Sequence, residues 1–315
     1  MQPIFYVIPF FIVSMLVEWR LLVHRQREQG ELIGYTPKDT AASLSMGLGM
    51  LAVNAVAKLA ALALYLWLFE FRLFDIPFTW WSVVLLIVAE DFCYYGFHRS
   101  HHEVRALWAA HVNHHSSTHY NLSTALRQSW TTPITGPLFW VPLPLLGFSV
   151  EMILLAQTIS LVYQYWIHTE LIGGMGWFEK VFNSPSHHRV HHGRNALYLD
   201  RNHGGILIIW DKLFGTFQAE LHDEKVDYGL TTNIETYNPV RIAFHEWAAI
   251  VRDVRHAATL RGKLGAVFMP PGWREDGTGR TAKVMRDEAQ AARQLTSATS
   301  SAPVNVGGAP GLAVP

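Results

Sequence analysis

Long runs of residues with no charged side chain, or with a single one, constrain the fold of this chain more than any other feature. Four such runs occur, and the two longest contain a single charged residue each. A helix crosses the hydrocarbon of a bilayer with roughly 20 apolar residues. The sequence therefore predicts an all-α integral membrane protein rather than a soluble domain. The runs cover residues 1–17, 41–69, 76–89 and 128–167.

The fourth run decides how many crossings are expected. It is about forty residues long and contains Pro133, Pro137, Pro142 and Pro144. Two Pro-bent crossings folded as a hairpin fit this length, and so does one crossing plus a re-entrant segment. We therefore expect a bundle of about four to five transmembrane helices.

Histidine is concentrated in three clusters, which read HRSHH at 98–102, HVNHH at 111–115 and HHRVHH at 187–192. Residues three and four apart share a helix face, so each cluster predicts imidazoles on one side. A zinc-type site takes four protein ligands, or three and a water, so eight imidazoles predict two metal centres. The predicted ligands are His98, His102, His111, His114, His115, His188, His191 and His192, with His168 as a ninth.

The remaining histidines and two carboxylates complete the set of candidate site residues. Asp91 and Glu103 are candidates to orient an imidazole by accepting its second N–H. His101 and His187 are adjacent to the ligand faces and are not predicted as ligands, while His119 and His203 stay undecided. Ordinary surface or core positions are expected for His24, His222, His245 and His256.

Composition excludes several other kinds of site and argues against one class of partner. Cys93 is the single cysteine, which excludes a disulfide framework and thiolate metal sites. Imidazole ligands suit zinc, copper, iron or nickel, so the residues alone leave the metal open. The 25 basic and 25 acidic side chains balance, which argues against nucleic acid as a partner.

The distribution of basic residues predicts the orientation in the membrane. Four Lys or Arg residues lie between positions 20 and 38, whereas the next loop carries only Arg72. Cytoplasmic loops are enriched in such residues. The third run then ends on the cytoplasmic side, and a hairpin at 128–167 returns the chain there. We therefore expect a cytosolic histidine-rich cap on a bacterial inner membrane or the endoplasmic reticulum.

The chain divides into three expected parts. Residues 1–220 form a membrane-embedded domain with the catalytic cap, and its motif core covers 80–220. Residues 221–274 form a cytosolic or interfacial extension, in which 240–258 fit either an amphipathic helix in the interface or an ordinary packed helix. Residues 275–315 are rich in Ala, Gly, Ser, Thr and Pro, which predicts a disordered tail.

The histidine motifs resemble those of the fatty acid hydroxylase / sterol desaturase superfamily of membrane di-iron oxygenases. The superfamily pattern H-x-x-x-H, H-x-x-H-H, H-x-x-H-H falls on the eight histidines of the three clusters. The likeness is closest to members that cleave alkylglycerol ether lipids. It rests on DFCYYGFHR (91–99), LWAAHVNHHSS (107–117), YNLSTALRQS (120–129), SPSHHRVHHGRN (184–195) and GGILIIWDKLFGTF (204–217). His101 and His203 depart from the family pattern.

The resemblance implies a chemistry. It predicts two iron ions and an O2-dependent monooxygenase that hydroxylates the carbon next to the ether oxygen of a membrane lipid, giving a hemiacetal that collapses to an aldehyde and glycerol. No G-x-G-x-x-G occurs, so the reductant is external, either tetrahydrobiopterin or a redox protein. Two alternatives stay open. One is a hydroxylase or desaturase of a sterol, carotenoid or fatty acyl chain, and the other is non-enzymatic metal binding or transport.

Overall fold

Helices make up the fold in the computed structural model, which describes residues 4–29 and 32–300. No strand forms among these residues, so the expected all-α architecture is confirmed for them. The longer helices are α1 (Ile4–Gln29), α2 (Pro37–Phe69), α3 (Trp80–Glu103), α8 (Val150–Trp166), α11 (Pro239–His256), α12 (Leu260–Phe268) and α13 (Ala282–Ser300). The shorter ones are α4 (Arg105–Ala109), α5 (Val112–His115), η1 (Thr124–Leu126), α6 (Thr132–Thr135), η2 (Pro137–Trp140), α7 (Pro142–Leu146), η3 (Gly176–Lys180), α9 (Pro185–His191) and α10 (Ile209–Phe214).

Two helices of the described part, α2 and α3, are long and apolar enough to cross a membrane. α2 has 33 residues and begins with Pro37, a residue whose fixed φ suits the first helical turn. α3 begins at a capping box in which the side chains of Thr79 and Ser82 each bond the other's backbone. It continues past its apolar part to Glu103, so the first histidine cluster extends from the end of a rigid helix.

Prolines divide the first half of the run at 128–167 into short helices. Pro133, Pro137 and Pro142 each stand in the first turn of a new segment, where the missing N–H costs nothing. Gly147 ends α7 with φ of 112°, where a side chain would collide with the Phe74 carbonyl. Only the second half of the run forms a longer helix, α8, whose 17 residues begin after the Ser149 cap.

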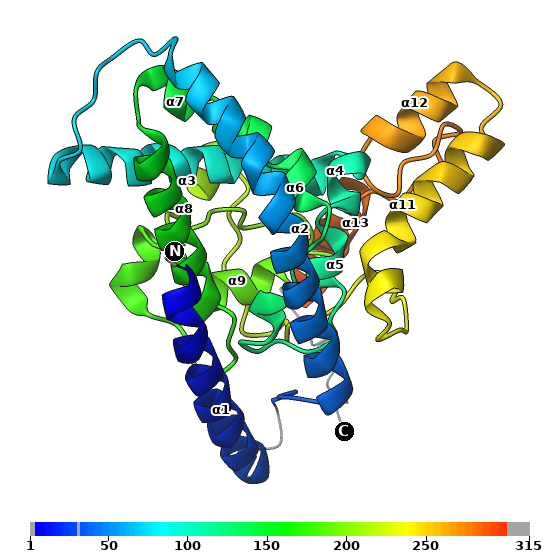
Figure 1. Ribbon diagram of the computed structural model, residues 1–315. Helices are drawn as coiled ribbons and strands as arrows, with labels where there is room; N and C mark the ends of the chain where they lie inside the picture. The colour runs from blue at the N-terminus through cyan, green and yellow to red at the C-terminus, as the bar shows by residue number, and fades with distance from the viewer. Residues whose placement is uncertain (1–3, 30–31, 301–315) are drawn as a thin grey trace, which may run out of the picture.

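The two long apolar helices, α2 and α3, both pack against α8 (Figure 1). α1 meets the C-terminal end of α8, where Phe11 stacks on Tyr165 with ring centroids 4.0 Å apart. The largest apolar core lies where α2, α3, α8 and the short proline-rich helices meet, and includes Leu86, Leu143 and Ile153. These contacts fix the end of α3 that carries the histidines.

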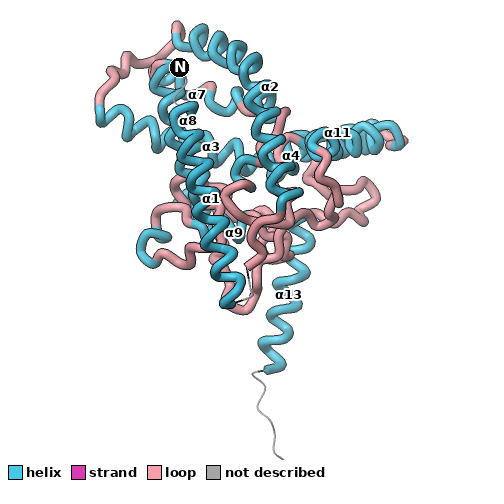
Figure 2. The backbone as a smooth tube through the Cα atoms, turned by 60° about the horizontal axis from the view of Figure 1, so that its bottom comes forward, coloured by secondary structure: helices cyan, strands magenta, loops and turns pink. Residues whose placement is uncertain are grey.

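The remaining helices surround the histidine-bearing segments. α11 and α12 form a hairpin that projects from the molecule, and its base packs against α4 (Figures 1 and 2). Arg105 of α4 holds α11 through Glu246 and Asp253, both with N–O distances of 2.7 Å.

The C-terminal segment differs from the expected disordered tail. Residues 282–300 form α13, while residues 301–315 lie outside the described part (Figure 2). The sequence of α13 contains five Ala, two Arg and two Gln, which favour helix. One side of it is also anchored, because Ala289 packs against the core around Tyr198 and Arg293 pairs with Asp223.

Candidate metal centre

The fold brings all nine predicted histidine ligands together in two groups. Within each group every histidine offers a ring nitrogen within 4.8 Å of the others. No side chain of the nine is more than 9% exposed. The five-histidine group consists of His98, His102, His111, His115 and His191, and the four-histidine group consists of His114, His168, His188 and His192.

Each group draws on segments far apart in the chain. α3 supplies two histidines, α5 and its N-cap supply three, and α9 with its C-cap supplies three. The ninth, His168, follows directly after α8. The second and third clusters are split between the groups, because adjacent residues of a helix point about 100° apart.

The ring nitrogens converge in a way that hydrogen bonding does not explain. In the five-histidine group the Nε2 atom of His111 lies 3.0 Å from that of His98 and 3.2 Å from that of His115. In the four-histidine group the Nε2 atom of His168 lies 3.2 Å from that of His114 and 3.0 Å from that of His188. Three ring nitrogens around one point, each with one proton or one lone pair, do not satisfy one another.

Further buried nitrogens lack any hydrogen-bond partner among the described residues. The Nε2 atoms of His102, His191 and His192 are in this position. A buried polar atom without a partner is costly and rare in folded proteins. A cation at the centre of each group would accept these lone pairs, so the donor set fits a bound metal ion.

Hydrogen bonds on the outer side of the rings fix which nitrogen faces inward. The Nδ1 atoms of His98, His168 and His191 lie 2.7–2.9 Å from backbone carbonyl oxygens. A carbonyl only accepts, so each Nδ1 carries the proton and each Nε2 presents its lone pair to the group.

Burial also keeps these imidazoles neutral. Burial, together with neighbouring histidines, lowers the pKa of His168 and of His191 to about 3. The pKa values of His114 and His188 lie well below the usual range for the same reasons. Neutral imidazole is the form that binds metal ions, so these side chains are in the form that a metal site requires.

The two carboxylates that the sequence offered as partners of imidazoles have other partners. Glu103 is exposed and pairs with Arg99 at 2.8 Å, because it ends α3 on the outer face of the helix. Asp91 accepts hydrogen bonds from the backbone of Ile206 and Leu207 and from Trp210, and so ties the chain before α10 to α3. Neither meets an imidazole of the two groups in the described part.

Asp200 is the carboxylate that contacts a histidine of the two groups in the described part, and it is absent from the residues predicted from the sequence. Its Oδ1 atom lies 3.2 Å from Nδ1 of His102. Burial raises the pKa of Asp200 to about 6, against the lowering effect of His203 and Arg286. Its position shortly after the third cluster was the one available signal, since 98 residues separate it from its partner.

The other histidines near the site have structural contacts. His101 bonds the Phe97 carbonyl and the Thr135 hydroxyl, which holds α3 against α6. His187 packs edge-on against Phe217. His203 is fully buried, with its ring centroid 5.1 Å from that of His102, but it offers no nitrogen to either group.

Comparisons with known proteins find one family model and several relatives. The model for fatty acid hydroxylase matches residues 83–216. Human alkylglycerol monooxygenase is 42% identical over 274 residues, which cover 84% of this chain and 58% of that protein. The Xenopus tropicalis alkylglycerol monooxygenase is 41% identical over 242 residues, covering 75% and 52%.

A more distant relative acts on another lipid. Ornithine lipid hydroxylase OlsE of Rhizobium tropici is 30% identical over 154 residues, which cover 49% of this chain and 46% of that protein. The chain thus spans about half the length of the curated relatives it matches. No solved structure matches the chain.

Proposed function

Through residues 83–216 the chain belongs to the fatty acid hydroxylase family, and from this premise we propose that it is a membrane-bound, O2-dependent monooxygenase of ether lipids. The observation that carries the proposal is the convergence of nine imidazoles into two buried groups. Four alkylglycerol monooxygenases, 37–42% identical over 75–84% of the chain, support the choice of substrate.

Each group of imidazoles would hold one iron ion, giving two per chain. Bound iron would supply the reduction of O2 that a C–H hydroxylation needs. The chain's own part is to present unprotonated Nε2 atoms and to hold four of the rings by bonds to Nδ1, those of His98, His102, His168 and His191. It also excludes water, since the nine side chains are buried. Imidazole alone would suit other metals, so the choice of iron rests on the family.

The proposed substrate is an alkylglycerol. One atom of O2 enters the C–H bond next to the ether oxygen and the other leaves as water, with two electrons from an external reductant and two protons. The resulting hemiacetal collapses to an aldehyde and glycerol. Tetrahydrobiopterin or a redox protein would supply the electrons.

The membrane arrangement is part of the proposal. α1, α2, α3 and the segment at 128–167 would form the bundle of four to five crossings within the domain at 1–220. The positive loop charges support a histidine cap on the cytoplasmic side of a bacterial inner membrane or the endoplasmic reticulum. The length and hydropathy of α2 and α3 support the proposal that these two helices cross the membrane.

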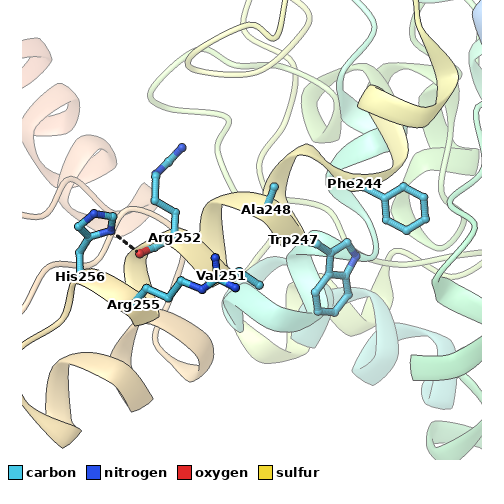
Figure 3. Close-up of a pocket in the computed structure, with 7 residues that line it drawn as sticks. All are labelled: Phe244, Trp247, Ala248, Val251, Arg252, Arg255 and His256. Carbon is cyan, nitrogen blue, oxygen red and sulfur yellow. Dashed lines mark hydrogen bonds between the residues drawn. The ribbon is translucent and has the colours of Figure 1, made fainter.

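Residues 221–274 would add a second contact with the membrane through the outer face of α11 and α12. On α11, Val240, Phe244 and Val251 are exposed. Arg252 and Arg255 flank this stripe, and both line a pocket with Phe244 and Val251 (Figure 3). The acidic residues of α11 are instead engaged with Arg105. An apolar stripe with basic flanks fits the interface of a bilayer that contains anionic lipids.

A fluorophore attached through Phe244→Cys, in a Cys93→Ser background, is expected to be quenched by spin-labelled lipids in nanodiscs. The same label at Lys283→Cys, on the exposed side of α13, is the matched control and should not be quenched. Equal quenching at the two positions would contradict the membrane contact and favour an ordinary packed hairpin.

The activity is tested with the iron-loaded protein in nanodiscs, an alkylglycerol and tetrahydrobiopterin or a chemical reductant. We expect one aldehyde for each O2 consumed, detected by mass spectrometry. If a sterol, carotenoid or fatty acid is hydroxylated and the ether lipid yields no aldehyde, the substrate is that other lipid and not an alkylglycerol. Absence of O2 consumption with every one of these lipids would refute the monooxygenase, and metal flux in proteoliposomes would then indicate transport.

A further inference from the structure

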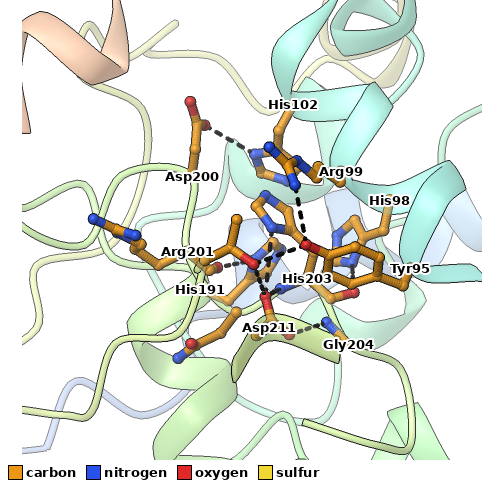
Figure 4. Close-up of polar contacts among 12 residues, drawn as sticks. Tyr95, His98, Arg99, His102, His191, Asp200, Arg201, His203, Gly204 and Asp211 are labelled. Carbon is orange, nitrogen blue, oxygen red and sulfur yellow. Dashed lines mark hydrogen bonds and ion pairs between the residues drawn. The ribbon is translucent and has the colours of Figure 1, made fainter. Parts of the chain in front are cut away.

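One short loop contacts three ligands of the five-histidine group from outside. The Asp200 carboxylate lies 3.2 Å from Nδ1 of His102. The carbonyl of Arg201 lies 2.8 Å from Nδ1 of His191, and the carbonyl of His203 lies 2.9 Å from Nδ1 of His98. Figure 4 shows these contacts converging from the loop on the ends of α3 and α9. The loop at 200–203 therefore orients three of the five imidazoles.

The backbone of this loop is held in a conformation that it would not adopt alone. Asp200 and Asn202 have φ of 49° and 58°, a region that costs non-glycine residues free energy. The Asn202 amide donates to the carbonyls of His187 and Gln218, and Asp211 accepts from the backbone N–H of His203. These buried bonds compensate the backbone conformation.

Asp200 is the only one of the three acceptors that carries a charge, and its second oxygen faces an arginine. Nη1 of Arg286 lies 3.8 Å from Oδ2 of Asp200 and 2.7 Å from the carbonyl oxygen of Leu199. The Arg286 side chain is 15% exposed. It belongs to α13, which begins at Ala282. The match to the family model ends earlier in the chain, at Thr216.

The two histidine groups differ in whether a carboxylate contacts one of their rings from outside. Among the described residues no carboxylate bonds a histidine of the four-histidine group, whose outer contact is the Gln164 carbonyl on His168. A carboxylate on the outer nitrogen of an imidazole raises the basicity of the ligand and fixes its ring. Asp200 can do this only while its own position is fixed.

We propose that Arg286 is a positioning residue for the five-histidine group: it holds Asp200 against His102, so that the C-terminal helix completes the outer bonds of one metal centre only. The inference rests on the proposed function, because it requires that the group binds a metal. The two metal centres are then inequivalent, because α13 acts only on the centre that includes His102.

The test uses the full-length chain in nanodiscs, stripped of metal and titrated with Co²⁺ alone. Cobalt bound to imidazoles absorbs visible light according to its coordination, so each centre has its own signature. In the unaltered chain we expect two equivalents. Arg286→Ala and Asp200→Asn should each lower the affinity for one equivalent of Co²⁺ about tenfold, the low end of the effect of losing an outer partner. The affinity for the other equivalent should stay unchanged.

Two further variants separate positioning from general damage. Arg286→Lys keeps a cation beside Asp200 and should restore most of the affinity and the cobalt spectrum. Arg280→Ala removes an exposed arginine that pairs with Glu288 instead, and should behave as the unaltered chain. The proposal is overturned if Arg286→Ala binds both equivalents normally, or weakens both equally. If the unaltered chain binds no cobalt, the proposed function itself fails.

Discussion

Replacing His191 by alanine is expected to remove one metal ion from the chain, and replacing His114 is expected to remove the other. His191 belongs to the five-histidine group and His114 to the four-histidine group. Each variant should fall from two irons to one after washing with a chelator, as measured by elemental analysis and Mössbauer spectroscopy. Monooxygenase activity should fall more than about 100-fold in both, beyond the effect of losing an outer partner.

The matched control is His222→Ala, because His222 is exposed and belongs to neither group. It should keep two irons and full activity. The two losses should also be additive, so that the double variant holds no iron while it remains folded. Retention of both irons in either single variant would refute the assignment of the groups. A single zinc in the unaltered chain would refute the oxygenase.

Local spacing indicates which histidines gather, because helical period decides which side chains share a face. The steps of three and four residues in the three clusters indicate the eight ligands, and the structure brings these eight together with His168. The same motifs carry the family resemblance, which the matched model confirms. Their division into two groups depends on how α3, α5 and α9 meet, which no single cluster contains.

Contacts over long sequence distances could not be predicted in this way. Asp200 and Arg286 lie in segments that look like ordinary loop and tail, and 87 residues separate Arg286 from Leu199. The predicted partner Glu103 has the right spacing on α3 but faces solvent with Arg99. Similarly, the prolines at 128–167 indicated breaks, but whether they bend one helix or start several depends on what each turn packs against.

Replacing Arg127 by methionine is expected to destabilise the chain by about 3–5 kcal/mol, the cost of leaving one charge of a buried pair without its partner. Arg127 is 1% exposed, and its Nη1 atom lies 3.1 Å from Oδ1 of Asp39 at the start of α2. Its Nε atom donates to the Asn113 carbonyl and to the Ser116 hydroxyl at the two ends of α5. Thermal and denaturant unfolding in detergent measure the loss.

The position of Arg127 predicts a second effect, on metal content. α5 has only four residues, too few for a stable helix by itself, and with its N-cap it carries three of the nine imidazoles. Iron should therefore be lost from both groups in Arg127→Met, unlike the single losses at His114 and His191.

A double variant distinguishes an unpaired charge from a lost packing contact. If the uncompensated Asp39 carboxylate causes the damage, Arg127→Met with Asp39→Leu should recover most of the stability, because apolar residues of similar volume often replace buried ion pairs without loss. Arg72→Met is the control, since its pair with Asp75 is largely exposed and should change stability by less than about 1 kcal/mol. If the double variant is no more stable than Arg127→Met, the hydrogen bonds to α5, and not the ion pair, hold this part of the site.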